Sequence, residues 1–289
     1  MLGHGKTAVA IIATYKAVKS GYQVAMMAPT AILSKQHLKN FENILSKFNV
    51  KCELLVSGIP KKQKEDILER LKNGEIDVLI GTHSLLEENV LFNNLGLAIT
   101  DEQHRFGVRQ RGVINSKGEK PDVLVMTATP IPRTLALILY GDLDISIIDE
   151  LPPNRKNIDT FAVTKGMEER VNIFIKKQLD EGRQCYIVCP LVEESEEIDA
   201  KSVTELFEKY KEEFKDYTVE YLHGKLKTKE KDEIMDRFKD GKIQILISTT
   251  VIEVGVDVPN SNIMIIENAE RFGLATLHQL RGRVGRRRI

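Results

Sequence analysis

Two adjacent carboxylates, Asp101 and Glu102, directly follow the apolar run 97–100. Successive residues of a strand point to opposite faces, so neighbouring carboxylates at a strand end can serve different tasks. We assign Asp101 to a magnesium ion and Glu102 to the attacking water, because phosphoryl transfer requires both charge neutralisation and in-line positioning. An isolated Asp-Glu pair is often a helix cap. Two further motifs, one near each end of the chain, favour a magnesium-nucleotide site instead.

A phosphate-binding pattern stands near the amino terminus, before the helical run Ala8–Ser20. Its residues are Gly3, Gly5, Lys6 and Thr7. In a P-loop, backbone N–H groups at a helix start hold the phosphates, the lysine reaches the β- and γ-phosphates, and the hydroxyl ligates magnesium. The full pattern G-x-x-x-x-G-K-[ST] would place its first glycine before Met1. A Gly-Lys-Thr tripeptide can arise by chance, but together with Asp101 it predicts a truncated P-loop.

A basic motif near the carboxyl terminus contains Gln279, Arg283 and Arg286, spaced by four and three residues. This spacing places all three on one face of the helix that we predict over Leu274–Val284. Arginines supplied to a γ-phosphate from a second domain can accelerate phosphoryl transfer by on the order of a thousandfold. A solvated basic helix end is the alternative, since cations are favoured there. The glycines inside the segment favour close backbone approach to a ligand.

Short apolar runs alternate with helical patterns through the first half of the chain. The expected strands are Gln23–Ala28, Lys51–Val56, Asp77–Ile80, Leu97–Thr100 and Val123–Thr127, and the expected helices between them include Thr30–Phe48 and Lys61–Lys72. This alternation favours an α/β fold, a mostly parallel sheet with helices on both faces. A sheet of this kind gathers the ends of its strands at one edge, where the carboxylates are expected.

The pattern is interrupted at 149–157, a polar segment with two prolines, and then restarts. The strands expected after it are Gln184–Val188, Thr218–Leu222, Gln244–Ser248 and Asn262–Glu267, and the helices are Met167–Glu181, Lys227–Asp240 and Leu274–Val284. We therefore predict two α/β domains, 1–148 and 158–289, joined by the linker 149–157. The two halves share an architecture in this prediction, but no local motif.

Composition sets weaker limits on function. The 42 basic and 42 acidic residues cancel, so net charge gives no support for a polyanionic partner. The acidic run Glu193–Asp199 is interpreted as a solvated loop. No apolar run is long enough to cross a bilayer and no secretory signal is present, which predicts a cytoplasmic protein. The odd number of cysteines excludes a closed disulfide framework, and the strand-like context of Cys185 and Cys189 favours buried thiols over zinc.

Together these motifs resemble the motor core of a superfamily 2 helicase, and within that group the RecG family. The resemblance covers nearly the whole chain. In the first predicted domain, motif I corresponds to Gly5-Lys6-Thr7, motif Ia to 28–30 with Gln36-His37, and motif Ib to 81–83. Motif II corresponds to 101–104 continuing to Arg111, and motif III to 127–129 continuing to Thr134. In the second predicted domain, motif IV and the segment after it correspond to 189–196 and 222–224, motif V to 248–259, and motif VI to 279–286.

The resemblance implies two RecA-like domains, ATP and Mg²⁺ as cofactors, and DNA as the partner of a monomeric translocase that acts on branched DNA in recombination and repair. It implies nucleotide contacts for Gly255 and Asp257, and coupling of hydrolysis to DNA for Gln103, His104, Thr127 and Thr129. The DNA backbone contacts that it implies are Pro29, Thr30, Gly81, Thr82, His83, Thr249 and Thr250, which would hold the strand without reading its sequence.

Two alternatives stay open. The motor of the transcription-repair coupling factor shares the type of stretch at 127–135, although Asp101–His104 and Cys189–Glu196 are more similar to RecG. The chain could also bind nucleic acid without turnover, because the resemblance places a wedge domain and a P-loop strand before Met1 and further residues after motif VI. We therefore expect this chain to lose preference for forked DNA, to bind ATP weakly and to turn it over slowly.

Overall fold

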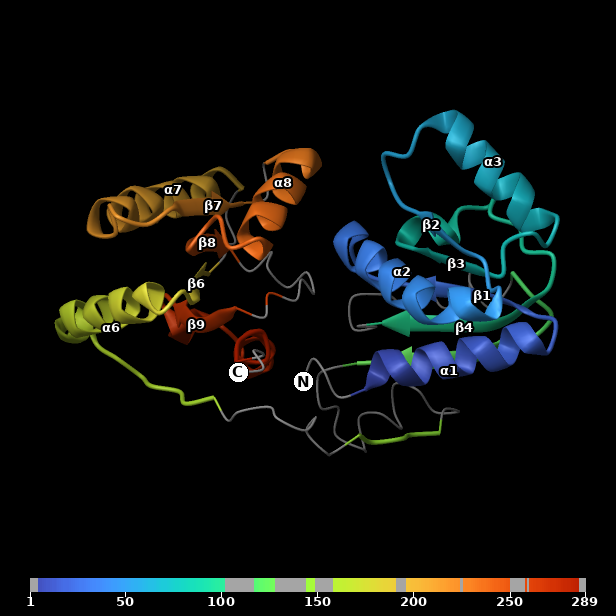
Figure 1. The fold of residues 1–289 in the computed structure, drawn as a ribbon, viewed down its shortest axis with the longest axis horizontal. Helices are drawn as coiled ribbons and strands as arrows, with labels where there is room; N and C mark the ends of the chain where they lie inside the picture. The colour runs from blue at the N-terminus through green and yellow to red at the C-terminus, as the bar shows by residue number, and fades with distance from the viewer. Residues whose placement is uncertain are drawn as a thin grey trace. The chain divides into compact units, whose positions relative to one another are not determined.

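The computed structural model describes residues 5–101, 117–127, 144–148, 158–190, 196–223, 226–249, 258 and 260–285. They form two compact units, one up to residue 148 and one from residue 158 (Figure 1). Each unit is built on its own sheet, and every strand pairing described in the two sheets is parallel.

The first unit has five strands in the order β2-β3-β1-β4-β5. Its elements in chain order are α1 (Lys6–Lys19), β1 (Gln23–Met27), α2 (Ala31–Leu45), η1 (Ser46–Phe48), β2 (Cys52–Leu55), α3 (Lys61–Lys72), β3 (Val78–Gly81), η2 (His83–Leu86), β4 (Leu95–Asp101) and β5 (Asp122–Met126). The expected strands are confirmed to within two residues at each end.

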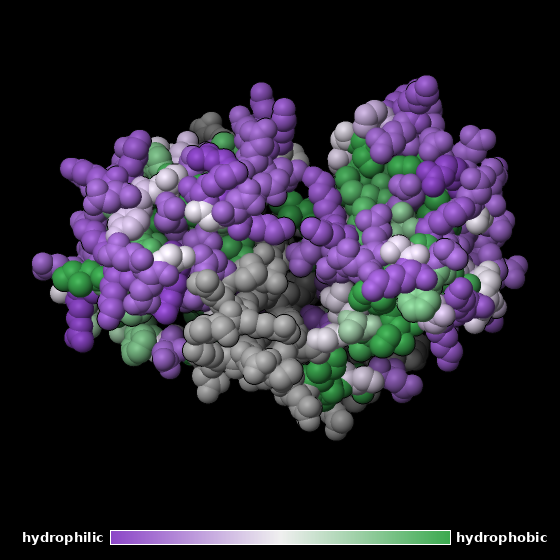
Figure 2. Space-filling view, in the orientation of Figure 1, coloured by the Kyte–Doolittle hydropathy of each residue, from purple (hydrophilic) through white to green (hydrophobic). Residues whose placement is uncertain are grey.

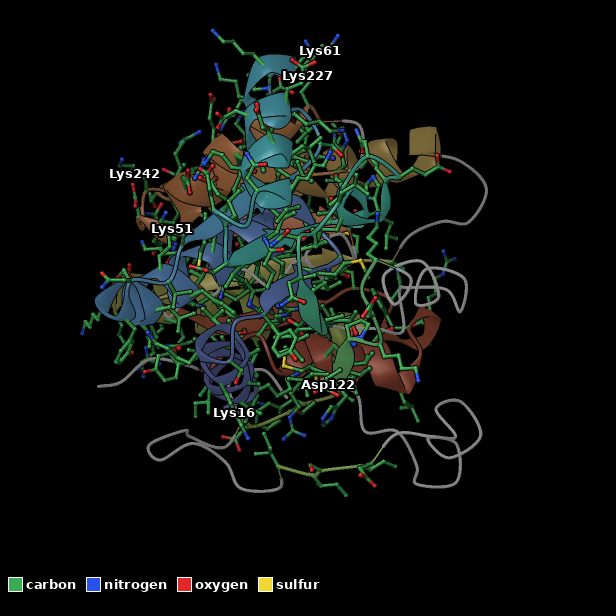
Figure 3. The ribbon with its side chains drawn as sticks, turned by 90° about the vertical axis from the view of Figure 1, so that its right-hand side faces the viewer. Lys16, Lys51, Lys61, Asp122, Lys227 and Lys242 are labelled. Carbon is green, nitrogen blue, oxygen red and sulfur yellow. The ribbon has the colours of Figure 1, made fainter. Side chains whose placement is uncertain are left out.

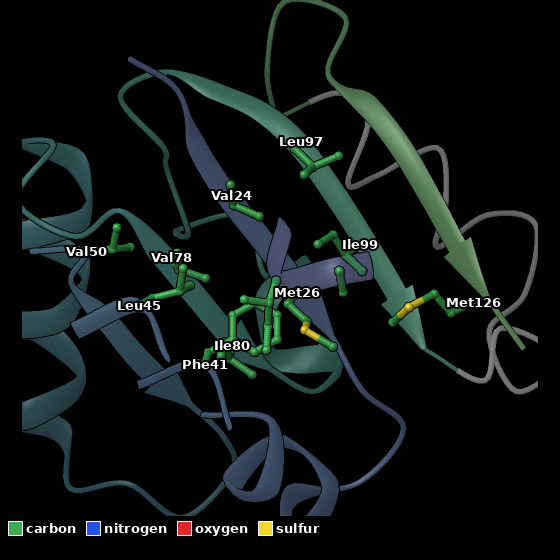
Figure 4. Packing of buried hydrophobic residues seen from close by; sticks show 12 residues of the cluster. Val24, Met26, Phe41, Leu45, Val50, Val78, Ile80, Leu97, Ile99 and Met126 are labelled. Carbon is green, nitrogen blue, oxygen red and sulfur yellow. The ribbon is translucent and has the colours of Figure 1, made fainter. Parts of the chain in front are cut away.

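Side chains of β1 alternate between two apolar cores. Val24 and Met26 pack with residues of α1 and α2, including Phe41 (Figure 4). Met27 packs on the other face with Leu71 of α3. Because both faces of the sheet are covered by apolar helix residues, every residue of β1 is buried, as expected for a central strand of a parallel sheet.

The second unit has four strands in the order β7-β8-β6-β9. Its elements are η4 (Lys165–Met167), α6 (Glu168–Asp180), β6 (Gln184–Cys189), α7 (Glu196–Glu213), β7 (Val219–Leu222), α8 (Thr228–Lys239), β8 (Ile245–Thr249), β9 (Ser261–Ile266), η6 (Ala269–Arg271) and α9 (Leu274–Arg281). Alternate residues of β6 again face two cores, Cys185 toward α6 and α7 and Tyr186 toward α8. The predicted α/β class with helices on both faces is therefore confirmed in each unit.

Two local predictions are wrong. The acidic run at 193–199 is not a loop throughout, because residues from Glu196 onward belong to α7. Carboxylates are favourable near a helix start, where they meet the positive end of the helix dipole. Helix α9 ends at Arg281 and not at Val284, with Gly282 as its cap and Gly285 in the left-handed region at φ 74°.

The two units also share a local motif, contrary to expectation. Residues 51–82 and 218–249 align without a gap, and their contacts correspond. Arg70 of α3 donates to Glu53 of β2 at 3.1 Å, and Arg237 of α8 donates to Glu220 of β7 at 3.0 Å. The sequence signal for this duplication was the pair of runs L-K-N-G-E-I and F-K-D-G-K-I.

A buried glutamine opens the central strand of the first sheet. The side-chain amide of Gln23 donates to the carbonyls of Leu71 and Ile76 at 2.9 and 2.7 Å. Its Oε1 accepts the backbone N–H groups of Asn93 and Asn94 at 2.7 and 3.0 Å. One side chain thus bonds to four backbone groups, which lie in the last turn of α3, in the turn after it and in the loop before β4.

Gln184 is the corresponding residue of the second unit, and it donates to the carbonyls of Phe238 and Ile243 at 2.5 and 2.7 Å. Its buried Oε1 has no hydrogen-bond partner in the part of the chain that the structure describes. The residue that corresponds to Asn93 in sequence is Pro259, and proline carries no N–H to donate. The same device therefore makes fewer bonds in the second unit.

We expect Gln23→Leu to destabilise its unit by at least about 2 kcal/mol more than Gln184→Leu destabilises the other. The carbonyls of Leu71 and Phe238 also accept the N–H groups of Gly74 and Gly241. Leucine therefore leaves three backbone groups without a partner in the first case and one in the second, at about 1–3 kcal/mol for each buried group. Hydrogen exchange resolved by peptide would measure each unit separately. Equal losses of protection in the two units would contradict the assignment of four bonds to Gln23.

The visible surfaces of both units are mostly hydrophilic (Figure 2). Charged side chains such as Lys16, Lys51 and Lys61 project outward (Figure 3). The outer side of α1 is an exception, since Val9 and Ile12 are exposed there. No helix in the described part of the chain combines the length and the apolar character needed to cross a membrane.

Candidate functional site

The carboxyl ends of the first sheet bring two predicted site residues together. Asp101 is the last residue of β4 and pairs with Met126 of β5, so Thr127 follows directly on the neighbouring strand. Parallel strands end at the same edge, and ligands of open α/β sheets bind outside that edge. Motifs II and III are thus adjacent at the expected position.

Helix α1 begins at the same edge. It packs on β1 and β4 and joins β1 through the short connection 20–22, so it runs antiparallel to the strands and starts at their carboxyl ends (Figure 1). Gly5 precedes the helix at φ 81°, a left-handed conformation that glycine adopts without strain. Lys6 and Thr7 occupy the first turn.

The start of α1 is suited to an anion. It has no side-chain cap and no acidic residue in its first turn. The first backbone N–H groups of a helix lack partners within the helix and lie at the positive end of its dipole. With Lys6 beside them, these groups form the type of site that binds phosphate. Thr7, in the same turn, adds a hydroxyl-bearing residue at the edge of the sheet where Asp101 ends its strand.

Asp101 has a buried partner that the sequence did not reveal. The Nε2 atom of His37, on α2, lies 2.9 Å from Oδ2 of Asp101. Both residues are buried, with 4 % and 7 % of their surfaces exposed. The only sequence signal for this contact is that His37 falls in the segment matched to motif Ia, where the resemblance assigns it no chemical role.

Thr7 and Asp101 supply ligands of the type that magnesium prefers. A hydroxyl and a carboxylate are hard oxygen donors, and Mg²⁺ is commonly held by one or two such groups together with phosphate oxygens and water. The described residues contain no group of three or more His, Cys, Asp or Glu side chains able to hold a metal ion by themselves. The residues present therefore fit a metal that arrives with a nucleotide.

Some of the residues assigned to DNA are accessible to solvent and others are buried. Pro29 and Thr30 are half-buried at the start of α2, where Thr30 accepts the N–H of Leu33 at 3.4 Å, and His83 is exposed. Gly81 and Thr82 are buried, and the Thr82 hydroxyl lies 3.3 Å from that of Ser84.

In the second unit, Thr249 corresponds to Thr82 in the duplicated segment and ends β8 with 1 % of its surface exposed. Its Oγ1 has no hydrogen-bond partner among the described atoms. The DNA assignments of all these residues stay predictions.

Motif VI is not a continuous helix. Gln279 is half-buried in α9, but Arg283 lies beyond the helix end at Arg281, so the argument that one helix face carries both is wrong. Gly282 and Gly285 account for the early end, since glycine stabilises helices poorly and adopts left-handed turns. Arg283 is 7 % exposed, whereas the exposed Arg281 donates to the carbonyl of Ile158 at 2.8 Å.

The remaining predicted site residues lie outside the described part of the chain. They are Gly3, Glu102, Gln103, His104, Thr129, Thr250, Gly255, Asp257 and Arg286. Their roles stay predictions. The thiols of Cys185 and Cys189 are buried in β6, and burial raises the pKa of Cys189 to about 12, with Glu267 adding to the shift. These thiols face cores and not a ligand.

Two helicase domain families match the chain. The DEAD/DEAH box helicase family matches residues 2–138, and the helicase conserved C-terminal domain matches residues 167–288. The chain is 51% identical over 286 residues to an ATP-dependent DNA helicase RecG of Bacillus subtilis, and 50% identical to that of Thermotoga maritima. Both alignments cover 99% of this chain but only 42% and 37% of those proteins, so the chain spans less than half of their length.

The fold agrees with these relatives. A solved structure of RecG bound to a three-way DNA junction superposes with a TM-score of 0.79 and 47% identity, covering 99% of this chain and 37% of that one. A solved structure of Mss116p bound to ssRNA and AMP-PNP has a TM-score of 0.73 at 20% identity, covering 98% of this chain and 61% of that one, and shows the same RecA-like fold. The chain therefore carries a DEAD/DEAH box helicase domain and a helicase C-terminal domain, and over 99% of its length it is similar to ATP-dependent DNA helicases named RecG.

Proposed function

We propose that the chain is the ATP-driven motor of a RecG-type DNA helicase. In this proposal it hydrolyses ATP to move along duplex DNA, and the longer protein regresses replication forks and moves Holliday junction branches. The observation that carries the proposal is the placement of Gly5-Lys6-Thr7 at the start of α1 beside the strand end that bears Asp101. The relatives named ATP-dependent DNA helicase RecG support the same activity.

Different residues of the chain bind the phosphates, hold the metal and orient the attacking water. Backbone N–H groups at the start of α1 and the Lys6 ammonium bind the phosphates. Thr7 and Asp101 would hold Mg²⁺, which neutralises phosphate charge when bound. Glu102 orients the attacking water and accepts its proton. Gln279, Arg283 and Arg286 address the γ-phosphate, and Gly255 and Asp257 contact the ribose side of the nucleotide.

DNA is the proposed partner, held through its backbone. Pro29, Thr30 and His83 are accessible at the carboxyl edge of the first sheet, where hydroxyl and backbone groups can contact phosphates without reading bases. The RecG structure bound to a three-way junction supports branched DNA as the substrate of the longer protein. Gln103, His104, Thr127 and Thr129 would couple hydrolysis to this contact. We further propose a monomer located in the cytoplasm.

The transcription-repair coupling factor is the less favoured alternative. The relatives at about half identity are named RecG, and their alignments run over 99% of the chain. A chain that binds nucleic acid without turnover is the alternative from another class, and a measurement of hydrolysis separates it from a motor.

The first experiment is steady-state ATP hydrolysis by this chain with and without duplex DNA, beside a Glu102→Gln control. Hydrolysis that DNA stimulates, and that the control lacks, would support the motor. If the folded chain shows no turnover but binds DNA, the binding alternative replaces the motor for this chain. Turnover equal in the control would remove the role assigned to Glu102.

A further inference from the structure

His37 contacts Asp101 but has no role in the chemistry proposed above. His37 lies one turn before Phe41 on α2, and its ring meets that of Phe41 edge-on at 6.5 Å between centroids. The imidazole is 4 % exposed, and its Nε2 lies 2.9 Å from the Asp101 carboxylate. A buried imidazole that reaches a predicted metal ligand is unusual enough to require a reason.

The hydrogen bonding assigns the tautomer of His37. A carboxylate only accepts, so Nε2 carries the proton and donates to Oδ2. The Nδ1 atom is buried without a partner among the described residues. His37 is thus the donor in this pair and Asp101 the acceptor.

We propose that His37 is a positioning residue that fixes the orientation of the Asp101 carboxylate for Mg²⁺. It would donate one hydrogen bond to Oδ2 and contribute no ligand of its own. A carboxylate has two oxygens and about four lone-pair directions, so this bond and metal coordination are compatible. The proposal rests on the proposed function, since it needs a metal nucleotide at the start of α1.

The surroundings hold His37 firmly enough for this task. Phe41 and Leu45, one and two turns further along α2, are buried in the core that also contains Ile99 of β4. The helix start is fixed by the Thr30 cap. A donor on a packed helix loses little freedom when it binds, and outer partners of this kind typically contribute about 10–100-fold to metal affinity.

Two substitutions separate positioning from packing. His37→Leu removes the donor and keeps an apolar side chain of similar reach. His37→Gln restores an amide N–H that can occupy the place of Nε2. We expect His37→Leu to weaken Mn²⁺ binding to the ADP complex by about 10–100-fold, and His37→Gln to remain within about threefold of the unmodified chain.

The readout is the electron paramagnetic resonance signal of free Mn²⁺ during titration of the chain with saturating ADP. ADP affinity in EDTA and thermal unfolding serve as controls, and both are expected to be unchanged. Unaltered Mn²⁺ affinity in folded His37→Leu would overturn the proposal, and so would equal losses in the two variants. If the unmodified chain binds Mn²⁺–ADP but the variants match it, only the positioning role fails. If the unmodified chain binds no metal nucleotide, the proposed function fails with it.

Discussion

Asp101→Asn is expected to reduce DNA-stimulated ATP hydrolysis by at least about a hundredfold, while the fold is retained. Asparagine keeps the shape of the side chain, and its oxygen can still accept from His37, so burial and packing are preserved. The lost charge is the one that would hold Mg²⁺ at the phosphates. Metal catalysis contributes several kcal/mol, and about 3 kcal/mol corresponds to a hundredfold in rate. The measurement is kcat at saturating duplex DNA.

Asp122→Asn is the matched control. Asp122 begins β5, the neighbour of β4, and is exposed at the opposite edge of the same sheet. It loses the same charge in the same unit without approaching the proposed site, so its kcat is expected to match that of the unmodified chain. Comparable activity of the two variants would show that Asp101 is not the metal carboxylate.

Gly81→Ala is expected to destabilise the first unit by at least about 3 kcal/mol. A Cβ atom on Gly81 would lie 2.2 Å from the carbonyl oxygen of Leu55 on the neighbouring strand. A backbone atom in a paired strand cannot move aside as a side chain can, so β2 and β3 must separate. Loss of hydrogen-exchange protection in peptides from β1, β2 and β3, with the second unit unchanged, is the expected result.

Alanine substitutions at two other glycines test whether the loss of stability follows the space available for a Cβ atom. A Cβ on Gly96 would lie 2.4 Å from Cγ and 2.6 Å from Cβ of Tyr22. Turning the 46 % exposed ring outward relieves the first contact but not the second, so Gly96→Ala is expected to cost less than Gly81→Ala without being neutral. Gly166 has no atom within 4 Å of an added Cβ, and Gly166→Ala is expected to be near neutral. Similar losses for all three would show that the space around Gly81 is not what selects glycine there.

The elements of both sheets could be predicted from the sequence because their signals are local. The run Gln23–Ala28 is apolar over the length of one strand, and Lys61–Lys72 has the helical period and ends before Asn73-Gly74; the structure confirms both. The end of α9 could not be placed, because hydrophobic spacing continues to Val284 while Gly282 ends the helix. The duplication was missed because fewer than half of its aligned positions are identical and these are scattered along the segment, although its backbone contacts match.

The sequence predicts only those neighbours within the site that lie at the ends of adjacent strands. Asp101 and Thr127 come from consecutive strands of the chain that also pair, so their proximity follows from the pattern alone. His37 is 64 residues from Asp101 in sequence, and contact between them depends on how α2 lies over the sheet. Side chains that meet through packing of a helix on a strand leave no periodic signal, which is why this partner was found only in the structure.

The turns at Asn73-Gly74 and Asp240-Gly241 occupy corresponding places in the two duplicated segments, before β3 and β8 and away from the carboxyl edges. A fluorophore attached at each turn would report the separation of the two domains without touching a proposed ligand. Cysteines introduced at Asn73 and Asp240 would be labelled selectively, because burial raises the pKa of Cys52 and of Cys189 to about 12 and that of Cys185 as well, which keeps these thiols protonated. The duplication thus provides a matched pair of positions from which any change in the distance between the two units on addition of ATP could be followed in real time.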